Sequence, residues 1–188
     1  MARALLLCAL LLPVVAGVAF AQGGSISIFS DPGGSDCNLY DLGQGLYEVY
    51  IVHVNSTGTK GCQFAAPAPA CLSCTYLSDI AGPYSVGIIG DSQTGAAAVY
   101  GECRASPIHV LTMVFHCPGG TAPCCYHKVV PHPCVSPPQV LAVDCSHPPE
   151  LQVITGGEGI WNPDGSCQCD VPAGVSSWGK IKSLFVTE

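Results

Sequence analysis

Residues 116–134 read HCPGGTAPCCYHKVVPHPC, a stretch with four cysteines, three histidines and four prolines. Thiolate and imidazole groups are ligands that zinc and copper prefer. In an oxidising compartment, however, cysteine thiols are normally converted to disulfides before a metal can bind them. The stretch is therefore either a metal site or a loop that disulfides fasten to the rest of the domain.

The spacing of the cysteines favours the disulfide-bonded loop. They lack the two closely spaced ligand pairs of the common structural zinc sites. Adjacent Cys124 and Cys125 cannot bond to each other without strain, so we expect each to pair with a different segment. The alternative, a zinc or copper site, would be built from imidazoles. Its candidate ligands are His109, His116, His127, His132 and His147.

The first residues of the chain indicate export. One basic residue, Arg3, precedes an apolar run from Ala4 to Phe20, and the small residues Ala19 and Ala21 stand where a signal peptidase cleaves. We expect residues 1–21 to be a secretory signal and residues 22–188 to form a single domain with no membrane span. The predicted location is secreted, either extracellular or periplasmic.

An even number of cysteines in an exported chain predicts a disulfide framework. The spacing of Cys71 and Cys74 in CLSC predicts a structural bridge, whereas Cys167 and Cys169 in CQC are expected to have different partners. The twelve cysteines expected to form disulfides are Cys37, Cys62, Cys71, Cys74, Cys103, Cys117, Cys124, Cys125, Cys134, Cys145, Cys167 and Cys169.

The charge of the chain bounds its partners. The formal net charge is −7, with only six lysines and arginines. Nucleic acids and anionic membranes are held by clustered basic residues, so neither is an expected partner. We expect a protein or carbohydrate ligand at the cell surface, and no cofactor.

Short apolar segments separated by glycine and proline predict strands joined by turns, because helical periodicity is nearly absent. Without helices for crossover connections, the expected fold is a mainly antiparallel β-sandwich of immunoglobulin-like or cohesin-like character. A short helical turn is possible over Cys71–Leu77, and residues 176–185 (SSWGKIKSLF) predict a short C-terminal helix or strand. The seven predicted strands are 25–29, 46–54, 84–89, 96–100, 108–115, 139–143 and 151–155.

Several longer segments resemble secreted bacterial proteins that have no assigned activity. The resemblance rests on ISIFSDPGGSDC, QFAAPAPAC, SPIHVL and CQCDVPAGVSSWGKIKSLF, which are spread over most of residues 22–188. It implies export and a shared sandwich-like domain, and it assigns no catalytic residue. The number and order of the predicted strands are also similar to those of cohesin-like and immunoglobulin-like surface modules.

One motif offers an enzymatic alternative. IIGDSQTG, residues 88–95, resembles the nucleophile block of GDS-type esterases, and DCSH resembles the block that carries their other triad members. Ser92 would be the nucleophile, His147 the base and Asp144 its orienting carboxylate. The spacing of the two blocks is short for that family, and its oxyanion-hole segments are missing. A hairpin turn over Asp91–Gly95 is the competing interpretation.

Two polar turns carry weaker signals. Asn55 begins an N-x-[ST] sequon in NSTGTKG, a possible glycosylation site in an exposed turn. The carboxylates of Asp31, Asp36 and Asp41 surround a glycine-rich turn, but their spacing matches no known calcium loop. The sequence as a whole predicts an exported, non-enzymatic structural or binding module, with the metal-binding protein and the esterase as alternatives.

Overall fold

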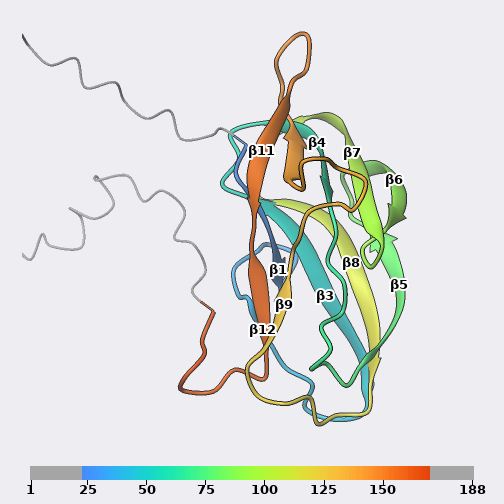
Figure 1. Ribbon diagram of the computed structural model, residues 1–188, viewed down its shortest axis with the longest axis vertical. Coiled ribbons are helices and arrows are strands. Elements are labelled where there is room, and N and C mark those ends of the chain that lie inside the picture. Colours follow the sequence, from blue (N-terminus) through green and yellow to red (C-terminus); the bar gives the residue numbers. More distant parts are fainter. Residues whose placement is uncertain (1–22, 170–188) are drawn as a thin grey trace, which may run out of the picture.

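The protein is described by a computed structural model that covers residues 23–169 (Figure 1). Within these residues the chain forms strands and no helix. The strands are β1 Ser25–Phe29, β2 Asn38–Leu39, β3 Gly45–Val54, β4 Thr59–Phe64, β5 Thr75–Ala81, β6 Ser85–Asp91, β7 Gly95–Arg104, β8 Ile108–Cys117, β9 Cys125–Lys128, β10 Val140–Val143, β11 Leu151–Gly156 and β12 Glu158–Trp161.

Nine of these strands form one large sheet in the order β5-β8-β3-β1-β11-β10-β4-β7-β6. Its two outermost strands, β5 and β6, contact each other, so the sheet curls into a nearly closed, barrel-like form. A second sheet contains β2, β12 and β9, and β12 continues the line of β11 along one side of the molecule (Figure 1). The all-β prediction is confirmed, but the large sheet is not clearly half of a sandwich.

The mainly antiparallel pairing is confirmed, although β1 pairs with β11 and β2 with β12 in parallel. The helical turn expected over Cys71–Leu77 is wrong, since strand β5 begins at Thr75. The predicted helix or strand over residues 176–185 lies outside the described residues. All seven predicted strands coincide with or overlap observed strands.

Alternation along the strands places one face of the large sheet in the core. In β3, Val49 and Ile51 are buried, and His53 on the same side is fully buried as well. Trp161 from the small sheet is the largest fully buried side chain, and its ring meets the ring of Phe115 from β8 edge to face, 6.0 Å between centroids. The small sheet therefore closes one end of the core of the large sheet.

Five disulfides join segments that are far apart in the sequence. Each of them fastens a loop to a strand or to another loop. Such links are consistent with an extracellular or otherwise oxidising environment. The pairs are Cys37–Cys169, Cys71–Cys125, Cys74–Cys117, Cys103–Cys145 and Cys124–Cys167.

Candidate functional site

The cysteine-rich stretch of residues 116–134 is a disulfide-bonded loop. Cys117 is bonded to Cys74, and the adjacent Cys124 and Cys125 are bonded to two different segments, as predicted. Of the four cysteines in this stretch, the exposed Cys134 is unpaired. Because the other three sulfurs are in disulfides, they cannot act as thiolate ligands for a metal.

Three predictions about the cysteines are wrong, the first being that Cys134 is in a disulfide, because it is exposed and unpaired. Cys71 and Cys74 do not bridge each other, since each bonds to a different part of the 116–134 loop. Cys62 is not in a disulfide: it lies in the core side of β4, where the Tyr100 hydroxyl donates a hydrogen bond to its Sγ over 3.1 Å. Burial raises the pKa of the Cys62 thiol to about 12, so it is neutral and unreactive. The prediction for Cys167 and Cys169 is confirmed.

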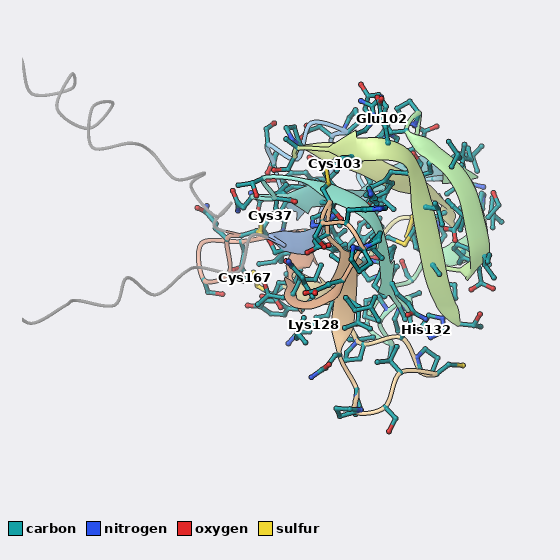
Figure 2. The ribbon with its side chains drawn as sticks, turned by 90° about the horizontal axis from the view of Figure 1, so that it is seen from above. Cys37, Glu102, Cys103, Lys128, His132 and Cys167 are labelled. Atoms are coloured by element: carbon teal, nitrogen blue, oxygen red, sulfur yellow. A yellow bond between two sulfur atoms is a disulfide. The ribbon has the colours of Figure 1, made fainter. Side chains whose placement is uncertain are left out.

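The five histidines of the metal alternative are not gathered at one point. Among the described residues, the groups of three ligand atoms close enough to share an ion contain no histidine. Both such groups consist of one aspartate and two cysteines that are bonded to each other, Cys74 with Cys117 and Cys124 with Cys167. Figure 2 shows His132 far from both Cys37 and Cys167.

Each of these histidines has its own surroundings. The His109 ring nitrogen Nε2 lies 2.9 Å from the Thr112 hydroxyl on the same strand. His132 packs against Gly95, at the turn between β6 and β7, where a side chain on Gly95 would collide with the imidazole. His116 and His147 are exposed.

His127 is a structural residue of the core. It is fully buried, its Nε2 lies 3.1 Å from the Ala66 carbonyl oxygen, and the Trp161 indole N–H donates to its Nδ1 over 3.4 Å. These partners fix the neutral tautomer with the proton on Nε2. Burial lowers the pKa of His127 to about 4, against the smaller raising effect of the Ala66 hydrogen bond. Burial also lowers the pKa of His53, whose Nδ1 is buried without a partner among the described residues.

We expect the protein to lose stability as the pH falls from about 6.5 to about 4. In that window the unfolded chain binds a proton at His127, whereas the folded chain does not, so protonation favours unfolding. The free energy of unfolding should fall by about 3 kcal/mol over this range, measured by guanidinium denaturation at a series of pH values. His127→Gln keeps a donor toward Ala66 and should make the free energy of unfolding less dependent on pH. An equally steep profile in that variant would contradict the assignment.

Ser92, the candidate nucleophile, is buried in a structural hydrogen-bond network. Its hydroxyl donates to Asp79 Oδ1 over 2.8 Å, and its backbone N–H donates to Asp79 Oδ2 over 2.6 Å. The side chain is inaccessible to solvent, and its carboxylate partner is Asp79 on β5 rather than Asp144. The turn interpretation is confirmed, because Asp91 and Gly95 pair at the end of the β6–β7 hairpin.

The other two members of the proposed triad lie in the loop between β10 and β11. Asp144 accepts hydrogen bonds from the backbone N–H groups of Ser146 and Glu150 and from the Gln152 side chain, so its carboxylate shapes that loop. His147 is exposed. No hydrogen bond within residues 23–169 joins either residue to Ser92, so the structure does not assemble this triad.

The polar turns also have structural roles. Asp31 accepts backbone hydrogen bonds from Gly33, Ser35 and Asp36, which is how an aspartate stabilises a tight turn. Asn55, at the start of the sequon, is exposed in a turn with a positive φ of 58°.

Asp41 is buried apart from the other two carboxylates. It accepts hydrogen bonds from the Asn162 amide and from the Thr121 backbone N–H. Burial alone would raise its pKa, but these hydrogen bonds hold the pKa below its usual value. Asp41 thus belongs to a network separate from the turn that Asp31 and Asp36 share.

A cavity of about 370 Å³ lies on the outer side of the small sheet. Its floor is Ile160, and Tyr126 of β9 and Glu158 of β12 stand beside it. The disulfide between Cys37 and Cys169 forms part of the opposite wall. Tyr126 is 41% exposed, so its ring is available to a ligand.

Glu158 at the rim of this cavity forms a surface ion pair with Lys128. The Lys128 ammonium lies 3.6 Å from the Glu158 carboxylate and 5.9 Å from the centre of the Tyr126 ring. The Gln168 side chain is an exposed amide at the same rim. No motif in the sequence marks these residues as a site. Burial alternates along β9: Cys125 and His127 are buried, and Tyr126 between them is exposed. This alternation points the Tyr126 ring outward.

No model of a protein family matches the chain, and a comparison with curated proteins finds no match. Within residues 23–169 the structure contains no helix long and apolar enough to cross a membrane.

Proposed function

We propose that the protein is an exported, non-enzymatic binding module of the cell surface or extracellular space, and that it binds a neutral carbohydrate in the cavity beside Tyr126. The observation that carries this proposal is an exposed aromatic ring within a cavity whose rim supplies a carboxylate and an amide. Export, the immunoglobulin-like character of the domain and the resemblance to secreted bacterial proteins all belong to this proposal.

The chemistry of the cavity suits a sugar. The face of an aromatic ring packs against the C–H groups of a pyranose, while the ring edge and hydroxyl stay hydrated. Carboxylate and amide groups such as those of Glu158 and Gln168 hydrogen-bond to vicinal hydroxyls. A small number of polar groups around an apolar floor is typical of sites that bind small molecules. The net charge of −7 disfavours acidic glycans, so a neutral sugar is the proposed ligand.

The scaffold around the cavity is rigid, which favours binding because little order has to be imposed on the protein when the ligand arrives. Tyr126 and Glu158 lie on paired strands of the small sheet, directly behind which Trp161 and His127 are packed in the core. The Cys37–Cys169 disulfide fixes the remaining wall. Neither Ser92 nor the scattered histidines supply a comparable site.

We expect Tyr126→Ala to weaken binding of neutral oligosaccharides at least about tenfold, because the stacking surface is lost. The measurement is a glycan array followed by calorimetric titration of the best ligand. Tyr84→Ala is a matched control, since Tyr84 is 40% exposed and lies in the turn between β5 and β6, outside this cavity. Absence of binding to every neutral glycan, or an equal loss in the control, would refute the proposal.

A further inference from the structure

The outer side of the large sheet carries a continuous apolar face across five neighbouring strands, β6, β7, β4, β10 and β11. One row of paired residues crosses it as Ile89, Ala97, Gln63, Leu141 and Val153. The next row is Gly87, Val99, Gly61, Val143 and Leu151. We call these two rows the apolar face. Gln63 is its one polar side chain.

The apolar face points away from the core, and within the described part of the chain its aliphatic side chains Val99 and Val153 are more than half exposed, whereas Leu141 in its middle is buried. The neighbouring positions Ala98, Cys62 and Ala142 point inward to the core, so the two rows must point outward. Ile89 is 76% exposed and Leu151 is 68% exposed. Soluble proteins seldom leave so many adjacent aliphatic side chains uncovered, and such a patch normally marks a contact.

The middle of the apolar face is recessed. A groove of about 340 Å³ runs over β4, β7, β10 and β11, and Gly61 lies in its floor. A Cβ on Gly61 would come within 2.6 Å of the Ala98 carbonyl oxygen, so no side chain can fill the groove at this point. The two rows hold no aromatic ring. The groove is therefore shaped to receive large apolar side chains from elsewhere.

The described chain ends on this same outer side of the large sheet. Cys169 is bonded to Cys37, and its backbone N–H donates to the Asn38 side chain over 3.1 Å. It packs in a cluster with Phe29 of β1 and Val52 of β3.

Pairing along the strands shows that this cluster and the apolar face share one side of the sheet. Ser25 pairs with Thr155, and Val52 pairs with Ser27. Since side chains alternate along a strand, Phe29 points to the same side as Ser25, and Val153 to the same side as Thr155. Strand β1 is the direct neighbour of β11, where the apolar face begins.

The residues that follow Cys169 are long enough and apolar enough to cover the face. Cys169 Sγ lies 3.6 Å from the Glu158 carbonyl oxygen. Val153 of the apolar face precedes Glu158 by five residues, which corresponds to about 17 Å along an extended strand. Trp178 stands nine residues after Cys169, a reach of about 30 Å when extended. Residues 170–188 also contain Ile181, Leu184 and Phe185.

We propose that residues 170–188 dock on the apolar face of their own chain, with Trp178, Ile181, Leu184 and Phe185 supplying the side chains that fill the groove. The tether favours this occupant, because a segment fixed at Cys169 is present at a high effective concentration at the neighbouring strands. The proposal does not depend on the carbohydrate site, since the apolar face and the cavity beside Tyr126 share no residue.

The tryptophans make a direct test possible. The chain has two, Trp161 and Trp178, so in a Trp161→Phe background Trp178 is the sole emitter. We expect it to emit as a buried indole, and we expect Leu151→Lys with Val153→Lys to shift the emission toward that of indole in water. Leu42→Lys, at an 87% exposed position outside the apolar face, is the matched control and should leave the emission unchanged.

A second measurement does not depend on the Trp161 background. Ending the chain after Cys169 retains all five disulfides and should raise the fluorescence of an apolar dye such as ANS several-fold over that of the full chain. Solvent-like Trp178 emission, or equal dye binding by the two chains, would overturn the proposal. So would Trp178 burial that disappears on dilution together with a dimer in light scattering, because that result assigns the face to a second copy. Loss of glycan binding alone would bear only on the carbohydrate proposal.

Discussion

Replacing Trp161 with alanine is expected to lower the free energy of unfolding by about 3 to 5 kcal/mol. The indole is 1% exposed and meets Phe115 edge to face, and its N–H donates to His127 Nδ1. Removing it leaves a cavity where the small sheet joins the large one, and it deprives a buried histidine of its donor. Guanidinium denaturation with the disulfides intact, followed by far-ultraviolet circular dichroism, measures the loss.

Trp161→Phe separates the two parts of this effect. Phenylalanine retains most of the apolar volume and the contact with Phe115, but it cannot donate to His127, so a loss of about 1 to 2 kcal/mol is expected. A loss below about 1 kcal/mol for the alanine variant would mean that the small sheet is not anchored to the core through Trp161.

The strands that the sequence predicts are short apolar segments bounded by turn residues. Residues 46–54 alternate between more and less buried positions over much of their length and are observed as β3, and the apolar run 108–115 is observed as β8, where a bulge interrupts the alternation. Strand β4 is missed because Gly61 and Cys62 interrupt its pattern, and β9 because it lies inside the cysteine-rich loop. These strands are stabilised by their partners, Ala98 and Trp161 among them, which are distant in the sequence.

The closure of the large sheet depends on pairings that no local pattern contains. Strand β1 pairs in parallel with β11, joining Ser25 to Thr155, and β5 meets β6 at the other end of the sheet order. Periodicity within a segment indicates which face is buried but not which strand lies beside it. The sequence therefore predicts an all-β fold, while the barrel-like curl follows from long-range contacts.

Single residues of the candidate site also show that local geometry can be predicted from the sequence, whereas contacts between distant segments cannot. Ser92 has the sequence context of a nucleophile, yet its partner Asp79 comes from β5, a strand that is not predicted from the sequence. Cysteine spacing correctly predicts that Cys124 and Cys125 diverge, because that prediction depends only on local geometry. Whether Cys62 finds a partner depends on the core around it, which spacing does not reveal.

Removing the Cys74–Cys117 disulfide by replacing both cysteines with alanine is expected to destabilise the protein by more than 4 kcal/mol. The two cysteines are 43 residues apart, and releasing a loop of this length stabilises the unfolded chain by roughly 4 kcal/mol. Both sulfurs are also buried, Cys117 completely, so their removal leaves a cavity beside the core. Denaturation of the purified, oxidised variant measures the change.

The Cys124–Cys167 disulfide is a matched control, because it also spans 43 residues while Cys124 is only partly buried. The two double-alanine variants release loops of equal length, so the difference between their losses reports the packing of the sulfurs in the folded state. We expect removal of the Cys74–Cys117 disulfide to lower the free energy of unfolding by about 1 to 2 kcal/mol more than removal of the Cys124–Cys167 disulfide does. Equal losses would assign the whole effect to the unfolded chain, whereas the absence of a loss in either variant would show that disulfides do not hold this loop-rich fold together.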